Sequence, residues 1–544
     1  MSTHWFPLKN YTHYSLLKGF SKPEELANKC KDNGYKACGL TDYKTISGAV
    51  SFYKACKKVG IKPIIGCAFD TFYVFAKNKN GWHDLIELIS CLDENENLPE
   101  GLLDKILSRN NLIKLLDSKI SDQPKSCYVN KEDAKLHRIL LCSEMKTTLP
   151  RVQKQIRKDK NGSVNVDSSF PKEYHNNVIY FMSDSYYLRS KDEIKKCDTK
   201  ILDDIYNQCE DYDILNKPML PKFQCPNNQS EEEYLKQLCR DGWKALLMTS
   251  GKVKDEENKK LYADRFNEEF NVIKDANLFG YFLIVRDIIQ YAESQGWLCG
   301  PGRGSAAGCL ISYLIGITKI DPIEFDLLFA RFYNAGRNSA DHISLPDIDM
   351  DVPGKRRDEV IAYLKNRYGN EYVSQMITFG RLQGRSAIKE VLRVNEACSF
   401  AEMNAITKSI PNEAEISDQL AEMDDEDRSI IRWALINNAK DLRDFCYIND
   451  DGKLEGDYAE YFDQAIKIEG TFKTQGKHAA GVVISAKKLN TVCPMVSQRG
   501  SLEKIAGLEM ADLEALGHVK FDVLGINLLD KIMMIQDYTG ETNG

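Results

Sequence analysis

The beginning of the chain alternates short apolar runs with segments whose apolar residues recur at helical spacing. Residues 23–33 and 48–59 have the helical pattern, whereas residues 37–41 and 62–66 are short apolar or β-branched runs. Strands that alternate with helices are typical of βαβ units. The pattern therefore predicts that this part folds around a parallel sheet or barrel.

The pattern changes further along the chain. Residues 75–120 are rich in helical patterns, and residues 151–178 are polar, which predicts a loop. Residues 216–226 are punctuated by prolines, as an extended linker would be, so we place a domain boundary there. Beyond it, residues 231–247 and 258–276 carry apolar residues at helical spacing and predict long helices.

Three aspartates occupy alternate positions: Asp347, Asp349 and Asp351. Residues two apart on a β-strand share a face, with Cα atoms roughly 6.8 Å apart. A strand here would turn the carboxylates to one face and Ile348 and Met350 to the other. Crowded carboxylates raise one another's pKa values, whereas Mg²⁺ ions bound to their oxygens would offset the repulsion. The triplet is a candidate two-metal centre; an acidic surface strand or turn is the alternative.

A glycine-rich loop, residues 300–308, precedes an apolar segment that predicts a helix from Ser305 through Leu314. Free backbone N–H groups at a helix start, with Ser305 as the cap, form a site for anions, and Arg303 adds positive charge. These features favour a triphosphate site. The alternative is a tight turn before a core helix, and the loop lacks the Gly-Lys-Ser/Thr of a Walker A motif.

Residues 519–525 predict another strand, with Lys520 and Asp522 on one face and Val519, Phe521 and Val523 on the other. A carboxylate on a distant strand could meet the aspartate triplet in space, as a two-metal site requires. The alternative is a surface Lys-x-Asp pair on an edge strand.

Composition narrows the class of protein. A chain of 544 residues should form several domains, since single cores rarely exceed about 300 residues. The hydrophobic share of 43% and charged share of 28% are ordinary for a soluble globular protein. There is no long apolar run and no signal peptide at the N-terminus, which favours an intracellular protein without a membrane segment. The sixteen cysteines are scattered without a Cys-x-x-Cys pair, as reduced thiols would be.

The net charge of −7 argues mildly against nucleic-acid binding. Basic segments at 355–357, 381–393 and 473–477 are, however, separate from the acidic run at 422–427. A basic groove on an acidic body is therefore compatible with the sequence.

Seven motifs follow one another in order along the chain, and together they resemble the family C replicative DNA polymerases, the bacterial DNA polymerase III α subunits. Weaker resemblance extends over nearly the whole chain from residue 6. The motifs are residues 280–285, 300–308, 326–332, 346–351, 377–380, 478–485 and 519–525.

The resemblance implies a multidomain protein of the α/β and α+β classes. A PHP (polymerase and histidinol phosphatase) domain with a β/α barrel would occupy residues 1–215. A nucleotidyltransferase palm of the polymerase β type would occupy residues 223–397 and 472–544. A helical thumb, residues 398–471, would be inserted in the palm and would grip duplex DNA by its phosphates.

The activity that the resemblance implies is DNA-dependent DNA synthesis: nucleotidyl transfer from a dNTP to a primer 3′-hydroxyl with two Mg²⁺ ions. Primer–template DNA and dNTPs would be its ligands, in a bacterial or phage-infected cell. A non-catalytic, polymerase-derived scaffold that binds DNA or replisome proteins is the alternative. A PHP-type phosphoesterase is disfavoured by missing metal ligands.

The resemblance also assigns the site residues. Asp349, Asp351 and Asp522 would be catalytic metal ligands, while Asp347 would either bind metal or support its neighbours. Residues that would contact nucleotide or primer phosphates are Arg303, Gly304, Ser305, Lys520, Arg381, Arg385 and Lys389. For those within residues 381–393, the solvated face of an amphipathic helix is the alternative.

The N-terminal domain departs from its family's metal-binding pattern. Lys9 and Tyr11 stand where metal-binding PHP domains have a His-x-His pair, Tyr43 replaces another histidine, and Ala68 replaces an acid. Lys, Tyr and Ala cannot replace such ligands, and of the ligands that can be aligned only Asp42 remains. We therefore expect a degenerate PHP domain without metal or nuclease activity, and we expect His13 to be a hydrogen-bonded structural histidine.

Family members continue beyond the last motif into fingers, a clamp-binding region and further modules, whereas this sequence stops at Gly544. We expect a second chain to supply the fingers and, through them, contact with a sliding clamp. A naturally split polymerase is slightly favoured over a truncated chain. Because we find no exonuclease motif, proofreading would come from elsewhere or be absent.

Overall fold

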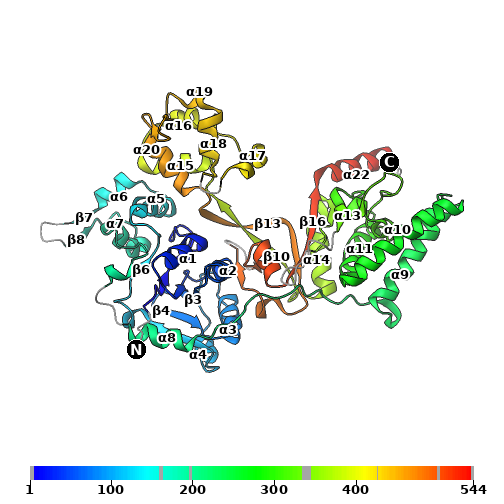
Figure 1. Ribbon diagram of the computed structural model, residues 1–544, viewed down its shortest axis with the longest axis horizontal. Coiled ribbons are helices and arrows are strands. Elements are labelled where there is room, and N and C mark those ends of the chain that lie inside the picture. Colours follow the sequence, from blue (N-terminus) through cyan, green and yellow to red (C-terminus); the bar gives the residue numbers. More distant parts are fainter. Residues whose placement is uncertain are drawn as a thin grey trace. The chain divides into compact units, whose positions relative to one another are not determined.

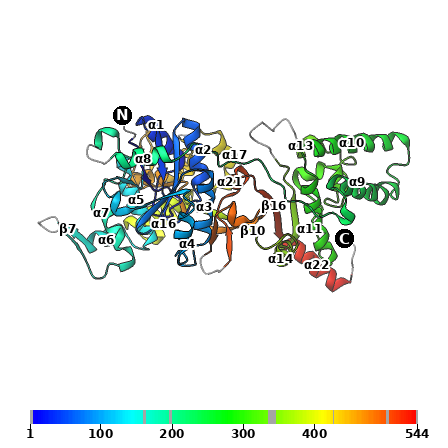
Figure 2. The ribbon, with the colours of Figure 1, turned by 90° about the horizontal axis from the view of Figure 1, so that it is seen from below.

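The structure is a computed structural model that describes residues 5–158, 163–194, 199–333, 345–424, 427–498 and 503–540. The chain forms two compact units (Figures 1 and 2). Unit 1 comprises Met1–Asp213 and Phe379–Gly476, and unit 2 comprises Ile214–Thr378 and Lys477–Gly544. The chain therefore leaves unit 2, returns to unit 1 and then completes unit 2.

Unit 1 begins with the predicted alternation of helices and strands. Its first elements are α1 (Pro23–Asp32), β2 (Ala37–Leu40), α2 (Ala49–Val59) and β3 (Lys62–Ala68). Strands β2 and β3 are parallel and α2 connects them, as a βαβ unit requires.

The sheet that follows is mixed rather than all parallel. Its order is β2-β3-β4-β5, in which β4 (Phe72–Ala76) runs antiparallel to β3 and to β5 (Leu112–Leu116). Only a tight turn separates β3 from β4, whereas a parallel connection needs a crossover of about a dozen residues or more. A second, two-stranded parallel sheet pairs β1 (Lys9–Asn10) with β6 (Lys125–Ser126).

Residues 75–120 were expected to be rich in helices. They contain α3 (Lys79–Ser90) and α4 (Leu102–Leu107), as expected, but also the strand β5. The loop predicted at 151–178 is wrong over its first part. That segment holds the end of α6 (Leu149–Gln155) and an antiparallel hairpin of β7 (Ile156–Lys158) and β8 (Val164–Val166). The residues of β8 are largely exposed, so the hairpin lacks the apolar alternation that reveals a half-buried strand.

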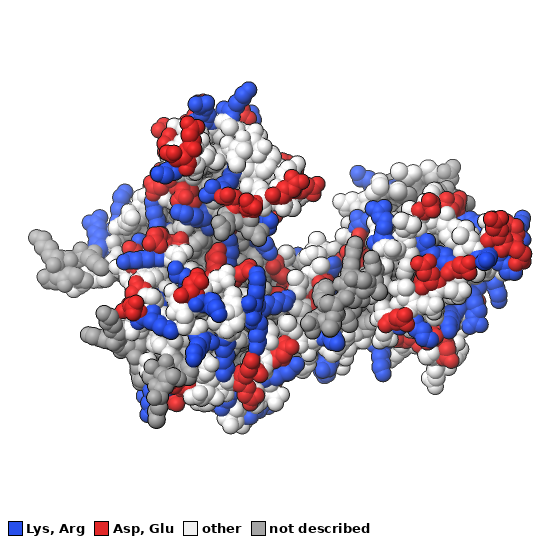
Figure 3. All heavy atoms as spheres, viewed as in Figure 1, with Lys and Arg blue, Asp and Glu red and all other residues white. Residues whose placement is uncertain are grey.

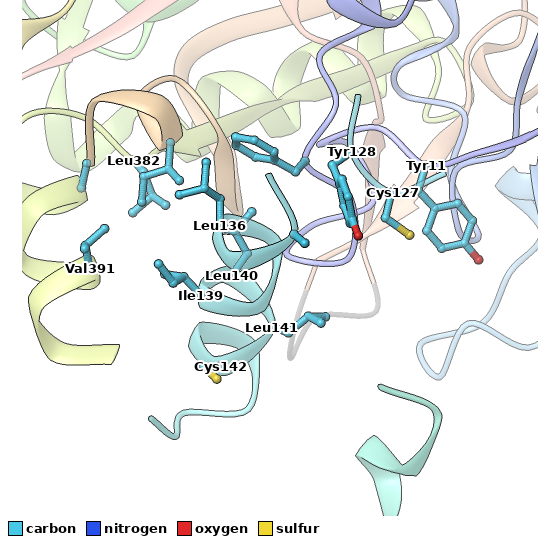
Figure 4. Packing of buried hydrophobic residues seen from close by; sticks show 14 of the residues in the cluster. Tyr11, Cys127, Tyr128, Leu136, Ile139, Leu140, Leu141, Cys142, Leu382 and Val391 are labelled. Carbon is cyan, nitrogen blue, oxygen red and sulfur yellow. The ribbon is translucent and has the colours of Figure 1, made fainter. Parts of the chain in front are cut away.

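The second segment of unit 1 is mainly helical and shares a core with the first. Figure 4 shows Leu136, Ile139 and Leu140 of α5 (Ala134–Glu144) beside Leu382 and Val391. The helices are α15 (Arg385–Asn395), α16 (Phe400–Thr407), α17 (Ser417–Glu422), α18 (Ile430–Asn437), α19 (Ala439–Leu442) and α20 (Ala459–Ile468). A short hairpin, β11 (Tyr447–Ile448) and β12 (Leu454–Glu455), precedes α20.

A six-stranded mixed sheet, ordered β14-β15-β10-β13-β16-β9, organises unit 2. Strand β16 runs parallel to β9 and antiparallel to β13. The strands are β9 (Asp349–Pro353), β10 (Val373–Arg381), β13 (Phe472–Ile484), β14 (Met495–Ser497), β15 (Lys504–Ala506) and β16 (Val519–Ile526). The last residues of β10 and the first residues of β13 fall in unit 1.

Helices pack on this sheet around a core of their own, which includes Phe282, Val352 and Phe521. The predicted helix at 231–247 corresponds to α9 (Glu231–Gly242), whose last turn continues into a π-helical segment, Trp243–Met248. Ser230 and Glu233 form a capping box at its start. The other main helices are α10 (Glu256–Asp275), α11 (Phe279–Ser294), α14 (Arg357–Tyr368) and α22 (Asn527–Thr539).

Among the described residues, no helix has the length and apolar character needed to cross a bilayer. Every cysteine in the same residues is free, in line with the reduced thiols expected from the sequence.

Candidate metal centre

Two parallel strands bring the predicted acids together. Asp349 on β9 lies opposite Asp522 on β16. Ile348 and Met350 are 1% exposed, whereas Asp349 and Asp351 are partly exposed, so the alternation expected from the sequence holds. Packing of the apolar face thus fixes the direction of the carboxylates. Asp347 precedes the first residue of β9 and is not part of the strand.

Carboxylate oxygens of Asp347, Asp349 and Asp522 lie within 4.8 Å of one another. Asp522 is buried, and its Oδ2 accepts a 2.6 Å bond from Lys520, while its Oδ1 has no hydrogen-bond partner in the part of the chain that the structure describes. An unpaired buried carboxylate oxygen is costly unless a cation binds it. The three carboxylates therefore fit a divalent cation with oxygen ligands.

Asp351 lies beside this group rather than in it. Its Oδ1 is 3.2 Å from Nη2 of Arg303, and Nε of the same guanidinium is 3.4 Å from Oδ2 of Asp349. The sequence favoured Asp349 and Asp351 as ligands and left Asp347 undecided. The geometry instead groups Asp347 with Asp349 and Asp522.

Burial and neighbouring charges shift the ionisation of the site. Burial raises the pKa of Asp347; Lys520 opposes the shift and Asp522 adds to it. Burial likewise raises the pKa of Asp351, opposed by Arg303 and reinforced by Asp349. Among the described residues, two basic side chains face four carboxylates, so these groups together carry net negative charge, which favours a cation.

Tyr281 of α11 holds the residue that precedes β9. Its hydroxyl oxygen accepts a hydrogen bond from the backbone N–H of Ile348 at 3.3 Å. Burial, followed by the charge of Asp347, raises the pKa of this phenol, which keeps it neutral. Sequence reasoning missed this role, although Tyr281 belongs to the first of the seven motifs.

The glycine-rich loop contacts the acidic strand directly. The N–H of Gly300 donates to the carbonyl of Asp351 at 3.0 Å, and a Cβ on Gly300 would lie 2.6 Å from the Cβ of Asp351. Gly302 has a φ of +99°, which other residues rarely adopt. Glycines here therefore allow the loop to pack against β9.

The helix predicted from Ser305 through Leu314 is interrupted. A 3₁₀ turn, Gly304–Gly308, is followed by α12 (Leu310–Leu314), and Ser305 does not cap it. Both oxygens of buried Glu269 accept backbone N–H bonds at 2.9 Å, from Leu310 and Ile311. This carboxylate, rather than a phosphate, occupies the N-terminus of α12, while binding of phosphate by Arg303, Gly304 and Ser305 of the loop stays a prediction.

The remaining phosphate-binding predictions belong to unit 1. The ring of Phe472 lies 5.1 Å from the guanidinium carbon of Arg381, the guanidinium of Arg385 donates to the carbonyl of Ile410, and Lys389 donates to Asn404 at 2.9 Å. Figure 3 shows basic and acidic side chains interspersed over the face it presents. Binding of phosphate by Arg381, Arg385 and Lys389 stays a prediction.

Residues that replace metal ligands in the N-terminal domain interact with other side chains of the protein. Lys9 forms an ion pair with Asp117 at 3.2 Å, and the Tyr43 hydroxyl donates to Asp70 at 2.5 Å. Ala68, the last residue of β3, is buried.

Asp42 is buried, and burial raises its pKa to about 6 even though its carboxylate accepts hydrogen bonds. The donors are the N–H and hydroxyl of Thr12, each at 2.7 Å, and the hydroxyl of Ser15 at 2.6 Å. The carboxylate of Asp42 therefore holds Thr12 and Ser15 in place.

Fold and site together define a multidomain α/β protein with a carboxylate centre suited to divalent cations. Residues 233–525 match the family model described as the bacterial DNA polymerase III alpha NTPase domain, and residues 7–157 match the PHP domain. The chain belongs to the bacterial DNA polymerase III alpha family.

Named relatives agree with this assignment. A DNA polymerase III subunit alpha from Halalkalibacterium halodurans is 30% identical over 98% of this chain and 49% of its own length. The corresponding protein of Staphylococcus aureus is 31% identical over 97% and 48%, and that of Aquifex aeolicus is 27% identical over 100% and 53%. The chain therefore spans about half the length of the curated relatives it matches.

Proposed function

We propose that this chain is the catalytic portion of a DNA-dependent DNA polymerase, which extends a primer 3′-hydroxyl with dNTPs on a template. The observation that carries the proposal is the pairing of Asp349 with Asp522 in register, with the Asp347 carboxylate in the same cluster. All three acids lie within the segment that matches the polymerase family. Fingers and contacts with other replisome subunits would complete the polymerase.

In this proposal, residues 223–397 and 472–544 form a palm of the polymerase β type, and residues 398–471 form a thumb. The thumb segment lies within Phe379–Gly476, which interrupts unit 2 along the chain. Residues 1–215 form a degenerate β/α barrel that serves as a scaffold without metal. The partners of Lys9, Tyr43 and Asp42 support that assignment, because these side chains are engaged within the protein.

Asp347, Asp349 and Asp522 would hold Mg²⁺, with Asp351 as a further carboxylate. When bound, two Mg²⁺ ions would lower the pKa of the primer hydroxyl and offset the charge of the triphosphate. The chain itself positions the nucleotide: Arg303, Gly304, Ser305 and Lys520 would contact the triphosphate oxygens through charge-assisted and backbone hydrogen bonds. Arg381, Arg385 and Lys389 would bind primer or nucleotide phosphates.

The test is Mg²⁺-dependent primer extension by this chain, alone and with a protein that carries polymerase fingers. Asp349→Asn and Asp522→Asn should each reduce extension at least about a hundredfold, because changes in residues that only support metal ligands already cost about 10–100-fold. Asp358→Asn is the matched control, since that side chain is 92% exposed on α14. It should leave extension unchanged.

Binding of Mn²⁺, measured by calorimetry on the same variants, separates the metal site from the activity. Wild-type chain that binds the metal but extends no primer with any fingers-bearing partner would favour the scaffold. Extension that survives both substitutions in full would overturn the assignment of the acids.

A further inference from the structure

The sixth of the seven motifs, residues 478–485, has no part in the proposed reaction so far. It forms the end of β13, the strand beside β16 in the sheet of unit 2. Its first residue is His478, which is partly exposed. A neutral imidazole can donate one hydrogen bond and accept another. The role inferred for His478 rests on the proposed function, because it concerns the same site.

The imidazole of His478 lies on the face of the sheet that carries the Asp522 carboxylate. Gly481 on β13 and Asp522 on β16 are partners in the antiparallel pair. Side chains of such partners project from one face, with Cβ atoms about 4.5–5.5 Å apart. A Cβ on Gly481 would lie 3.1 Å from Nδ1 of His478. The ring therefore covers Gly481, where a side chain next to Asp522 would otherwise be.

Glycine at position 481 makes this placement possible. A Cβ there would also lie 2.6 Å from Cε of Met376, whose side chain is buried, so neither neighbour has room for it. On its other side, Asp522 pairs with Asp349 of β9. Strand β16 thus has His478 on one flank and a second acid of the cluster on the other.

Two backbone groups fix the orientation of the ring. Nδ1 of His478 accepts hydrogen bonds from the N–H of Gly481 at 2.8 Å and from that of Ala480 at 3.2 Å. A ring nitrogen that accepts carries no proton, so the proton of the neutral imidazole is on Nε2. The pairing of β13 with β16 runs from Gly481 to Ile484, so the ring binds these N–H groups where that pairing ends.

The Nε2–H group of His478 has no acceptor among the described residues. A donor that is held in place beforehand loses little freedom when it binds a ligand. Phosphate oxygens are negatively charged acceptors, so a hydrogen bond to one would be charge-assisted. Because the donor is neutral, it would not reduce the negative charge that the acids offer to a cation.

We propose that Nε2–H of His478 donates a hydrogen bond to a phosphate oxygen of a polymerase substrate bound at the acids. The acceptor belongs either to the nucleotide triphosphate or to a primer phosphate, which offer the same chemistry. His478 would contact the substrate directly, beside the charged contacts assigned to Arg303 and Lys520.

The test observes the ring nitrogens of His478 by nuclear magnetic resonance. The full chain is labelled with ¹⁵N-histidine, and each of its eight histidines gives ring signals in a long-range ¹H–¹⁵N spectrum. Loss of signals in His478→Asn identifies those of His478. Spectra of the wild-type chain are compared in MgCl₂ alone, with dCTP in MgCl₂, and with primer–template DNA in MgCl₂. Calorimetry on the same samples measures whether each ligand binds.

We expect the proton on Nε2 in MgCl₂ alone, and a ligand-induced shift that is larger at Nε2 than at Nδ1. A shift with dCTP would identify the triphosphate as the acceptor, and a shift with DNA would identify a primer phosphate. Unchanged Nε2 signals despite binding of both ligands would overturn the role of His478 and leave the proposed function intact. Absence of binding of either ligand would overturn both.

Asparagine and glutamine separate the roles of the two ring nitrogens. Oδ1 of asparagine can replace Nδ1 as the acceptor but leaves no donor at Nε2, whereas the amide of glutamine reaches the position of Nε2. His478→Asn should weaken binding of the shifting ligand about tenfold or more, and His478→Gln should keep it within about threefold. His175→Asn, at an exposed residue of unit 1, should leave binding unchanged.

The opposite order, with binding retained in His478→Asn and lost in His478→Gln, would show that the histidine only holds the backbone and would overturn the proposal. Circular dichroism shows whether the variants are folded. Should one of them unfold, the other identifies the His478 signals and the wild-type spectra decide.

Discussion

At the scale of single residues, unit 1 holds a titratable group in its neutral form. His13 is buried and stacks on Phe472 with ring centroids 3.9 Å apart. Burial lowers its pKa to about 3, and the positive charges of Lys22 and Arg381 act in the same direction. Its packing agrees with the structural role expected for this histidine, but its Nδ1 has no hydrogen-bond partner among the described residues.

His13 makes the stability of unit 1 depend on pH. Its folded pKa lies below the unfolded value of about 6.5, so its contribution is complete above that value and is lost as pH falls towards 3. Urea denaturation at pH 7, 6 and 5 should show a fall of up to about 1.4 kcal/mol per pH unit from this group.

His13→Phe keeps an aromatic ring but removes the titration, so the fall should be shallower in this variant. His137, whose pKa burial lowers to about 4, titrates in the same direction in both proteins and cancels in the comparison. An identical pH dependence with and without His13 would contradict the prediction.

The alternation of polar and apolar residues along β9 is the feature of the site that the sequence predicts. It predicted that Met350 would take the face opposite its aspartate neighbours, and in the structure Met350 is buried while Asp349 and Asp351 are partly exposed. It could not predict that Asp347, which lies outside the strand, joins Asp349 and Asp522, because that depends on how the chain enters β9. Nor could it predict the contact of Gly300 with Asp351, which is a long-range packing effect.

At the scale of elements, the start of α12 shows how a distant side chain can decide where a helix begins. Arg265 and Glu269 are one turn apart on α10, with Nε and Oε1 at 2.7 Å. Local sequence identified Ser305 as the cap, but Glu269 binds the N–H groups of Leu310 and Ile311 instead. The helix propensity of the segment around Ser305 gives no information about its contact with Glu269.

Glu269→Gln should destabilise unit 2 by about 2–4 kcal/mol, because the amide nitrogen cannot accept one of the two N–H bonds and Arg265 loses its counter-charge. Glu268→Gln is the control: this neighbour is exposed, and the change should stay within about 0.5 kcal/mol. Urea denaturation measures both variants. Equal stabilities of the two would contradict the capping role of Glu269.

At the scale of the whole molecule, the two units have separate hydrophobic cores. The helix–strand alternation predicted the βαβ start of unit 1, and the periodic segments predicted α9 and α10. The mixed character of both sheets was not predictable, since strand order depends on which edges remain free once neighbouring elements have paired.

Separate cores predict that Mg²⁺ should stabilise one unit selectively. At a concentration of about 100 times its dissociation constant, a bound ion adds about 2.7 kcal/mol to the folded state. Hydrogen exchange followed by mass spectrometry should therefore slow in β9 and β16 but not in β2–β5. The double variant Asp349→Asn/Asp522→Asn should abolish the effect. Equal slowing in β2–β5 would show that the N-terminal domain binds metal as well.

The position of β9 at the end of its sheet has a consequence for synthesis of the protein. Its neighbour among the described strands is β16, which leaves the ribosome much later because translation runs from the N-terminus. During that interval β9 is a strand without a partner, and such edges invite pairing with other chains. Charged side chains discourage that pairing. Asp347, Asp349 and Asp351 would thus protect the nascent chain from aggregation before they ever meet Asp522.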